Sequence, residues 1–149
     1  MANPSKVKGT TFETAMVKLL TQELGMEFKR MPLSGAISYL KSDLWVPSDT
    51  AAWPFSTECK SYAEIEWNNL LTAKSTELHE FWRQVSKDAE TMKKKPLLLF
   101  KWNRSKPYAG YNDFTIECES YVEVKSFGHN FRIALLTDWL EAYKKKLPK

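Results

Sequence analysis

The sequence contains little cysteine and little histidine. Its two cysteines, Cys59 and Cys118, have no C-x-x-C spacing, which excludes a disulfide framework and argues against a zinc knuckle. Both thiols are therefore expected to be reduced and buried, as free cysteines in protein cores usually are. The two histidines, His79 and His129, lack spaced partner ligands and are not expected to bind a metal.

Long apolar segments are also missing. No uncharged apolar run approaches the roughly 18 residues that a membrane span requires, and segment 1–8 lacks the apolar region of a secretory signal peptide. These absences predict a cytoplasmic protein without a membrane partner, located in the host cytoplasm if the source is a virus. With 149 residues, 43% of them hydrophobic, the chain is predicted to form a single domain with a flexible arm at 1–8 and a frayed lysine-rich tail at 144–149.

The chain carries a net charge of +4 and has a sequence pI near 9.0, which suits a polyanionic partner without requiring one. Its positive charges are clustered at Lys6 and Lys8, Lys93-Lys94-Lys95, Lys101 to Lys106, and Lys144-Lys145-Lys146. Such clusters bind nucleic-acid phosphates, but cations at helix C-termini are also favoured by about 0.3 to 1 kcal/mol each. Both interpretations, DNA binding and helix capping, stay open.

Hydrophobic periodicity predicts two long helices. In segment 12–24 apolar residues recur at helical spacing before a C-capping glycine, and Glu13 flanks the apolar stripe. The second helix begins with Ser75 or Thr76 as its N-cap and ends at Met92. Its apolar residues follow the helical repeat throughout, so this is the clearest helix in the chain.

Extended segments surround these helices. The predicted strands are 26–31, 43–46, 55–61, 97–100, 114–118, 121–125 and 131–136. The second and third strands are joined by a turn-like stretch and are expected to form a hairpin. Segments 32–38 and 103–113 are predicted to be loops, and Thr137 is expected to cap a short final helix.

The predicted hairpin brings together residues suited to phosphodiester hydrolysis, which needs an activated nucleophile and neutralisation of phosphate charge. Side chains alternate along a strand, so Glu58 and Lys60 point to one face and Cys59 to the other. Asp43, on the partner strand, can share Mg²⁺ with Glu58 and with the backbone carbonyl of Cys59. Lys60 is then placed to position water or to stabilise charge in the transition state.

Short motifs also arise by chance. With 18 acids and 18 lysines, about two acid-x-Lys triplets are expected in a chain of this length. The sequence contains three, which begin at Glu27, Glu58 and Glu123. Only the triplet of Glu58 follows both a helical acid and an acid on a hairpin partner, and precedes a strong helix and a buried strand. Glu123 is preceded by Asp113, so this pair stays a competitor.

Three segments resemble the signature of archaeal-type Holliday-junction resolvases, which belong to the PD-(D/E)XK nuclease superfamily. Segment 8–13 (KGTTFE) is similar to their K-G-x-x-x-E, segment 42–44 (SDL) to V-D-L, and segment 57–60 (TECK) to I-E-V-K. Exonuclease-like relatives often show Q-x-x-x-Y on the second helix, whereas here Gln84 is followed by Asp88.

The resemblance extends to neighbouring residues. Arg30 and the Ser34-Gly35 loop fall where the resolvases carry an arginine and a mobile serine-rich loop. Segment 114–118 looks like their closing strand. The sequence departs from the superfamily name at Ser42, where a proline is expected.

The resemblance implies a PD-(D/E)XK (restriction-endonuclease-like) α/β fold, with a mixed central sheet flanked by helices in the order αβββαβ plus C-terminal strands and a short helix. It also implies a homodimer that resolves four-way junctions by paired symmetric nicks in DNA recombination and repair, leaving 5′-phosphate ends. The expected catalytic residues are Glu13, Asp43, Glu58 and Lys60. Mg²⁺, replaceable by Mn²⁺, is expected on Asp43, Glu58 and the Cys59 carbonyl, with Glu13 as a candidate further ligand. The expected DNA-contacting residues are Lys6, Lys8, Arg30, Ser34, Gly35, Lys93, Lys94 and Lys95.

Two other classes of function stay open. One is a restriction-like or repair nuclease for duplex or flapped DNA, and the other is a non-catalytic nucleic-acid-binding module with the nuclease fold. The residues also have structural explanations: Glu13 as a surface helix acid and Asp43 as a turn acid. Glu58 and Lys60 would then form a cross-strand ion pair worth under about 1 kcal/mol. Metal-dependent cleavage separates the enzymes from the binding module.

Tryptophan is the remaining feature that bears on function. Trp45, Trp82 and Trp102 fall at apolar positions of predicted elements and are expected in the core. Trp53 and Trp67 lie in loop-like stretches beside the predicted active strand, which makes them candidates for stacking on exposed bases.

Overall fold

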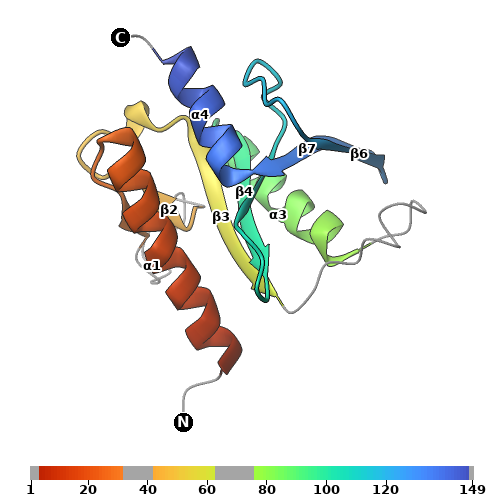
Figure 1. Cartoon of the computed structure of the whole chain (residues 1–149), viewed down its shortest axis with the longest axis horizontal. Helices are drawn as coiled ribbons and strands as arrows, with labels where there is room; N and C mark the ends of the chain where they lie inside the picture. The colour runs from red at the N-terminus through yellow and green to blue at the C-terminus, as the bar shows by residue number, and fades with distance from the viewer. Residues whose placement is uncertain (1–3, 32–41, 63–75, 148–149) are drawn as a thin grey trace.

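The structure is a computed structural model that describes residues 4–31, 42–62 and 76–147 (Figure 1). Its helices are α1 (Pro4–Leu24), α3 (Glu77–Met92) and α4 (Leu136–Lys146), with a short 3-10 helix at Thr50–Ala52. Its strands are β1 (Lys29–Arg30), β2 (Leu44–Trp45), β3 (Phe55–Tyr62), β4 (Lys95–Trp102), β5 (Tyr108–Tyr111), β6 (Val122–Ser126) and β7 (His129–Leu135). Among these residues, no helix has both the length and the hydropathy needed to cross a membrane.

The described strands form one seven-stranded mixed sheet in the order β1-β2-β3-β4-β5-β7-β6. β3 and β4 run parallel, whereas the other neighbouring pairs are antiparallel. α1 and α4 cover one face of the sheet, and α3 covers the other (Figure 1). The expected mixed sheet with flanking helices, in the order αβββαβ followed by further strands and a helix, is confirmed.

The alternation of side chains along β3 serves both helical layers. Phe55 and Cys59 are buried in the core beneath α1 and α4, whereas Glu58 points to α3. The neighbouring segment 97–100 of β4 is buried on both faces, and alternate residues enter the two cores. A continuous apolar run is typical of such a doubly covered strand, so this prediction is confirmed.

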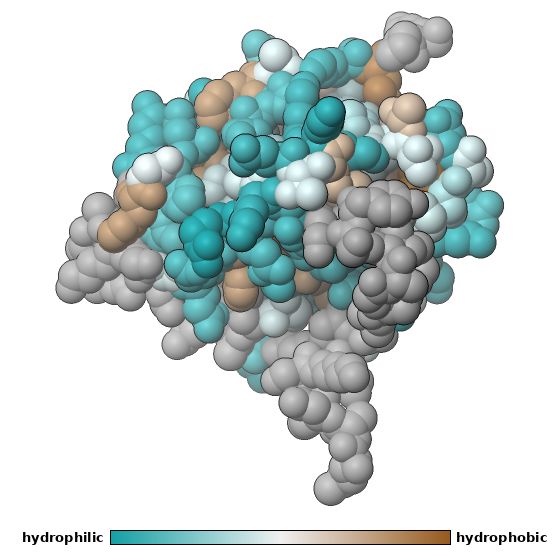
Figure 2. Space-filling model, turned by 180° about the vertical axis from the view of Figure 1, so that it is seen from behind, coloured by the Kyte–Doolittle hydropathy of each residue, from teal (hydrophilic) through white to brown (hydrophobic). Residues whose placement is uncertain are grey.

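α3 begins after Thr76, which is its N-cap and one of the two residues predicted for that role. The Thr76 hydroxyl accepts a hydrogen bond from the His79 N–H, and the His79 ring accepts one from the Thr76 N–H. This is a capping box with histidine in place of the usual glutamate or glutamine. The helix ends where Lys93 adopts a left-handed backbone, with φ 55°. Seen from the side of α3, the surface is mostly hydrophilic (Figure 2).

The helices extend farther toward both chain ends than the sequence patterns predict. α1 begins at Pro4, inside the expected arm 1–8, and proline is well suited to the first turn because its missing N–H would have no helical partner there. α4 continues through Lys146, inside the expected tail 144–149. Lys144 and Lys146 donate hydrogen bonds to acidic side chains elsewhere in the fold, which ties down this last turn.

The segment 103–113 is predicted to be a loop, but it contains β5, which lies between β4 and β7. Gly110 of this strand lies opposite Leu98, and a Cβ at Gly110 would come within 3.4 Å of the Leu98 Cβ. Glycine therefore permits the close packing of two central strands. A short segment with glycine between polar residues is also typical of loops, which explains the wrong prediction.

The prediction for segment 114–118 is also wrong. This segment is expected to be the closing strand, but it forms turns and no strand. The Asp113 carboxylate accepts a hydrogen bond from the Thr115 N–H at 3.2 Å, and local bonds of this kind compete with strand formation. Ile116 and Cys118 are nevertheless buried, which produces the strand-like alternation in the sequence. As expected, Cys59 and Cys118 are both free and buried.

Candidate active site

The carboxylate of Asp43 is held where β2 joins β3. Leu44 pairs with Thr57 across these antiparallel strands, and the Asp43 N–H donates to the Thr57 carbonyl at 2.7 Å. Farther along β3, Oδ2 of Asp43 accepts a hydrogen bond from the Cys59 N–H, also at 2.7 Å. The side chain of Asp43 takes the place of a backbone carbonyl in the ladder, which fixes its carboxylate against β3.

Ser42 reinforces this junction of the two strands. Its buried hydroxyl accepts a hydrogen bond from the Thr57 N–H at 2.9 Å and donates one to the Leu44 carbonyl at 2.7 Å. Proline, which the superfamily name places here, has no hydroxyl for either bond. In the sequence Ser42 is visible only as a departure from the family pattern, because its role depends on the strand register.

Glu58 is buried beside two other carboxylates. Its exposed fraction is 5%, and the side chains of Asp43 and Asp88 lie within hydrogen-bond distance of its carboxyl group. Burial, reinforced by the charge of Asp43, raises the pKa of Glu58 to about 9, whereas Lys60 acts in the opposite direction. Without a bound cation, Glu58 therefore carries a proton at neutral pH.

Asp88 is a site residue that the sequence analysis did not identify. It lies on α3 and brings a third carboxylate to the acids of β2 and β3. Val85 and Ala89 of the same helix are buried, so Asp88 borders the apolar stripe. An acid at the margin of such a stripe is a signal in the sequence, but the sequence does not say which strand the helix covers.

Glu13 reaches the same site from α1. Its Oε2 accepts a hydrogen bond from Nε of Arg30 at 2.9 Å, and both side chains are half-buried. Burial and the charge of Asp43 raise the pKa of Glu13, whereas Arg30 and Lys60 act in the opposite direction. Glu13 is therefore no isolated surface acid. Arg30, predicted to contact DNA, here orients a candidate catalytic residue.

Lys60 lies on the same face of β3 as Glu58, as the strand alternation predicts. Its ammonium nitrogen lies 5.2 Å from the centre of the Phe81 ring of α3. None of the ion pairs between described residues joins Lys60 to Glu58. The aromatic contact keeps the cation near the acids without committing it to one of them.

The donor atoms at the site are those that a hard divalent cation prefers. The N–H and C=O of one strand residue point to the same neighbouring strand, so the Cys59 carbonyl faces the side of Asp43, to which its N–H is bonded. Together with the carboxylates of Asp43 and Glu58 it offers oxygen ligands, as Mg²⁺ requires. Within the described residues, no three His, Cys, Asp or Glu side chains are spaced as metal ligands. The neighbouring acids raise the pKa of Glu58, and a bound cation would favour its ionised form.

The two competing acid-x-Lys triplets have different surroundings. Glu27 and Lys29 form an exposed ion pair with each other at 3.6 Å. Glu123 lies 3.6 Å from Lys125 on β6, while Asp113, the acid that precedes it, forms its ion pairs with lysines of β4 and α4. In both triplets the lysine neutralises its own acid, which favours the triplet of Glu58.

Four of the predicted DNA-contacting residues have no described side-chain surroundings. Ser34 and Gly35 lie outside the described residues. Lys6 and Lys8 lie in the first half of α1, where only the backbone is described. DNA contacts at these positions stay predictions.

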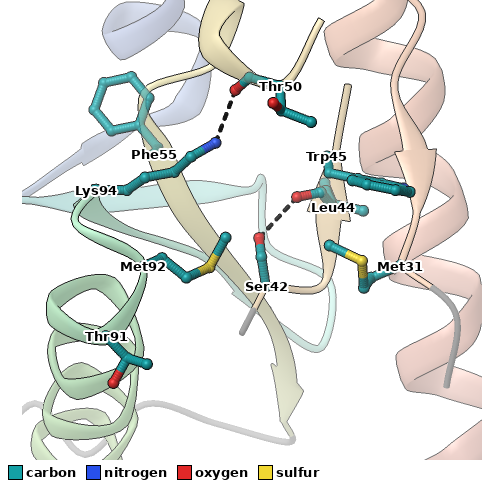
Figure 3. A pocket seen from close by; sticks show the side chains of 9 residues that line it. All are labelled: Met31, Ser42, Leu44, Trp45, Thr50, Phe55, Thr91, Met92 and Lys94. Atoms are coloured by element: carbon teal, nitrogen blue, oxygen red, sulfur yellow. Dashed lines mark hydrogen bonds between the residues drawn. The ribbon is translucent and has the colours of Figure 1, made fainter. Parts of the chain in front are cut away.

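The lysine cluster after α3 has structural roles. Nζ of Lys94 donates hydrogen bonds to backbone carbonyls, including that of Thr50 at 2.9 Å (Figure 3). Nζ of Lys95 forms an ion pair with Asp113 at 2.8 Å. Lys93 caps the helix through its left-handed backbone, and its side chain is exposed. Helix and loop anchoring therefore accounts for Lys94 and Lys95, whereas a DNA contact of the exposed Lys93 stays a prediction.

A cavity of about 430 Å³ lies beside the site, between β2 and the C-terminal end of α3 (Figure 3). Its lining residues are Met31, Ser42, Leu44, Trp45, Thr50, Phe55, Thr91, Met92 and Lys94. The acids of the site are not among them, and most lining side chains are apolar. Phosphodiester chemistry is therefore expected at the acids outside this cavity, and Ser42 borders both.

Trp53 does not stack on bases, because its exposed fraction is 1%. Its Nε1 donates a hydrogen bond to the Thr57 hydroxyl at 2.9 Å, and its ring packs edge-on against Phe28 and Phe55. Trp67, the other candidate, lies outside the described residues. Of the tryptophans expected in the core, Trp82 is buried, whereas Trp45 and Trp102 are half-buried.

Three comparisons relate the chain to known proteins. Residues 4–142 match the model of the family described as "Phage putative PDDEXK endonuclease". Protein D14 of Escherichia phage T5 is 32% identical over 115 residues, which cover 70% of this chain and 68% of that protein. Hjc, a Holliday junction resolvase from the archaeal hyperthermophile Archaeoglobus fulgidus, has a similar structure with a TM-score of 0.50 and 15% identity. That similarity covers 92% of this chain and 99% of the resolvase.

The family match runs from the start of α1 into α4 and so includes every element of the site. The likeness to the archaeal resolvase is one of fold, and it spans nearly the whole of both chains. This chain therefore belongs to the phage PD-(D/E)XK endonuclease family, and its fold is a PD-(D/E)XK nuclease fold like that of the archaeal resolvase.

Proposed function

We propose that this protein is a divalent-metal-dependent endodeoxyribonuclease that cuts four-way DNA junctions by paired symmetric nicks. The observation that carries the proposal is the meeting of two acids, Asp43 beside β2 and Glu58 of β3, with Lys60 on the same face of β3. Carboxylates buried together destabilise a fold, so such an arrangement favours a role in chemistry. Membership of a nuclease family supports the same conclusion.

The proposed metal ligands are Asp43, Glu58 and the Cys59 carbonyl, with Glu13 as a further ligand either directly or through water. Mg²⁺, which Mn²⁺ is expected to replace, would stabilise charge on the phosphate and lower the pKa of an attacking water. Lys60 is placed to orient that water or to stabilise the same charge. Attack of water on phosphorus breaks the bond to the 3′ oxygen, which takes up a proton, and leaves a 5′-phosphate.

Three further residues act by positioning these groups. Ser42 holds the two strands together beside Asp43. Arg30 orients Glu13 by the hydrogen bond from its Nε. Asp88 contacts Glu58 from α3 and so constrains its carboxyl group.

Junction selectivity and dimerisation are the finer parts of the proposal. Support comes from the fold shared with the archaeal protein, whose name makes it a Holliday junction resolvase. Two symmetric nicks require two active sites related by a two-fold axis, hence a homodimer. Lys6, Lys8 and Lys93 are proposed to contact phosphates of the junction arms. Segment 32–38, with Ser34 and Gly35, is proposed to approach the strand-exchange point.

The experiment is a competition between a labelled immobile junction and excess linear duplex of equal length, in Mg²⁺ at physiological salt. Paired nicking of the junction is expected to persist in the presence of the duplex. Asp43→Asn, Glu58→Gln and Lys60→Ala should each lower the cleavage rate by at least about 10²-fold while junction binding persists. Glu27→Gln is the matched control, because it changes the acid of another acid-x-Lys triplet, which forms an exposed ion pair outside the site.

The other outcomes of this experiment each point elsewhere. Equal cutting of duplex and junction would leave a restriction-like or repair nuclease. Binding without cleavage in any divalent metal would leave a nucleic-acid-binding module. Activity that survives Glu58→Gln but is lost in Glu123→Gln would show that the triplet of β6 carries the chemistry.

A further inference from the structure

β6 lies at one end of the sheet, away from α1 (Figure 1). It pairs with β7 on one side, and no other described strand pairs with its outer side. Three of the four large hydrophobic side chains that are exposed in the described part of the chain lie on or beside it: Tyr121 (44%), Val122 (44%) and Phe127 (56%). An unpaired strand with exposed apolar groups is a docking edge for another strand.

The hairpin between β6 and β7 decides which backbone groups face outward. Ser126 pairs with His129 across the two-residue turn 127–128. The residues that flank such a turn bond to each other, so the even-numbered residues of 122–126 use their backbone groups within the hairpin. The N–H and C=O groups of the odd-numbered residues of 121–125 therefore point outward, where a second strand can bind them.

The sequence of β6 is complementary to itself in charge. Antiparallel pairing of two β6 strands centred on Val124 places Glu123 opposite Lys125 of the second copy, and the symmetry repeats this pair. Glu123 and Lys125 are residues whose backbone groups point outward, so the same register also forms backbone hydrogen bonds. Registers centred on Glu123 or on Lys125 satisfy the backbone as well, but they place like charges opposite each other, which is unfavourable.

The exposed apolar groups suit the same register. Val122 comes to lie opposite Ser126 of the second copy and next to its Phe127, at both ends of the paired strands. Val124, at the centre, already packs into the core beneath α3. Within one copy Glu123 lies 3.6 Å from Lys125 Nζ and 3.6 Å from Nε of Arg132, its neighbour on β7. The contact with Lys125 is of little energetic value, and a second strand would exchange it for cross-strand pairs.

We propose that this edge is the dimer interface, with β6 of one copy adding antiparallel to β6 of a second copy. The inference rests on the homodimer of the proposed function and adds where that homodimer forms. The two sheets become continuous, and the β3 strands lie nine strand spacings apart, which is about 43 Å at about 4.8 Å per spacing. At that separation each active site acts on a DNA strand of its own, as paired nicking requires.

Glu123 and Lys125 also have a simpler explanation, because charged side chains protect edge strands from aggregation. A merely protected edge predicts a monomer, or a dimer that forms through another surface. The two explanations differ in what happens when the charges are exchanged.

The test measures the mass of full-length variants by sedimentation over a range of concentrations. Glu123→Lys and Lys125→Glu alone each place like charges opposite each other, and each should weaken dimerisation by at least about tenfold. The double exchange restores opposite charges between the copies and should restore most of the dimer, although the lysine introduced at 123 then lies opposite Arg132 of its own copy. A mixture of the two single variants should form a heterodimer, because one edge is then doubly positive and the other doubly negative.

Glu27→Lys and Lys29→Glu are the matched control, because this exposed pair has the same 3.6 Å separation and lies at β1, the other end of the sheet. Thermal unfolding of each variant separates loss of the dimer from loss of the fold. If wild type is a dimer and both single variants dimerise equally well, this interface alone is overturned. The same holds if the single variants lose the dimer and the double exchange does not recover it. A wild-type monomer overturns the homodimer as well, whereas metal-dependent cleavage by the same sample tests the nuclease independently.

Discussion

Replacing Glu58 with glutamine is expected to stabilise the protein in the absence of divalent metal while it removes cleavage. Glu58 is buried against Asp43 and Asp88, and its pKa is raised from 4.5 to about 9, chiefly by burial. At neutral pH the folded protein holds a proton on Glu58 that the unfolded chain releases. Folding must take up this proton, which opposes folding, whereas glutamine has no such requirement.

The size of the effect follows from the same pKa values. Below the pKa of 4.5 that Glu58 has in the unfolded chain, the carboxyl group lowers the free energy of unfolding no more than glutamine would. This loss of stability grows as the pH rises toward about 9, the pKa of Glu58 in the folded protein. At neutral pH the interval is about 2.5 units, which at about 1.4 kcal/mol per unit gives an upper limit of about 3 kcal/mol. The amide of glutamine can donate to the Asp43 carboxylate as protonated Glu58 does, so no hydrogen bond need be lost.

Urea unfolding in EDTA, at about pH 5 and about pH 8, measures this difference in stability. Glu58→Gln should exceed wild type by more at the higher pH, whereas the control Glu27→Gln, at an exposed acid, should stay close to wild type at both. Added Mg²⁺ should stabilise wild type but not Glu58→Gln, because a ligand stabilises only a fold that binds it. The same pH dependence in wild type and Glu58→Gln would refute the burial of this acid beside the others.

Other predictions concern the supports of the site and the choice of metal. Ser42→Ala should lower the free energy of unfolding by about 1 to 2 kcal/mol and slow cleavage, because the Thr57 N–H and the Leu44 carbonyl lose a buried partner. Ser42→Thr, which keeps the hydroxyl, is the control, and equal losses in both variants would assign the effect to packing. Arg104→Gly should raise the free energy of unfolding by about 0.5 to 1 kcal/mol, because Arg104 has a left-handed backbone with a φ of 64°. The control Arg83→Gly, within α3, should lower it by about 1 kcal/mol. A lower free energy of unfolding in Arg104→Gly would contradict the reasoning. Ca²⁺ should support junction binding in a gel-shift assay with little cleavage, and rapid cleavage in Ca²⁺ would contradict the role given to Mg²⁺.

The backbone of the site could be predicted from the sequence because it depends on local rules. Strand alternation places Glu58 and Lys60 on one face, and the turn-like stretch before β3 makes β2 its antiparallel neighbour. Asp43 then falls beside Glu58, and the structure holds it there by the Cys59 N–H. The same local reasoning found Thr76 as the cap of α3, because capping depends on residues three positions apart.

Contacts between elements could not be predicted in this way. Asp88 meets Glu58 because of how α3 is rotated over the sheet, and hydrophobic periodicity gives the buried face of a helix without naming the strand beneath it. Arg30 bonds to Glu13 because β1 passes beside α1. The sequence shows an arginine on a strand and an acid on a helix, but the pairing is a result of tertiary packing.

The wrong predictions for Gly110 and Trp53 share a physical cause. In both cases the local composition favours a loop, whereas packing against the rest of the fold decides the structure. Gly110 reads as a loop residue, yet it allows β5 to approach Leu98 in the middle of the sheet. Trp53 lies in a turn-like stretch, yet its large apolar ring is worth more inside the core, where Thr57 bonds to its N–H. In each case a property other than local propensity decides where the residue lies: the small size of Gly110 and the large apolar ring of Trp53.

The two ends of the sheet differ in strand length, and the difference fits the roles proposed for the acids and for β6. β2 has only two residues, so the Asp43 side chain completes the ladder, and from Cys59 onward no described strand pairs with that side of β3. On the proposed function, a DNA backbone would approach the acids from this side of β3. β6, with five residues and self-complementary charges, offers an edge long enough for another strand. Because four strand steps of one hydrogen-bonded sheet separate β3 from β6, a second copy bound at β6 leaves the acids open to DNA, and charge exchange at β6 should leave the chemistry of each single site intact.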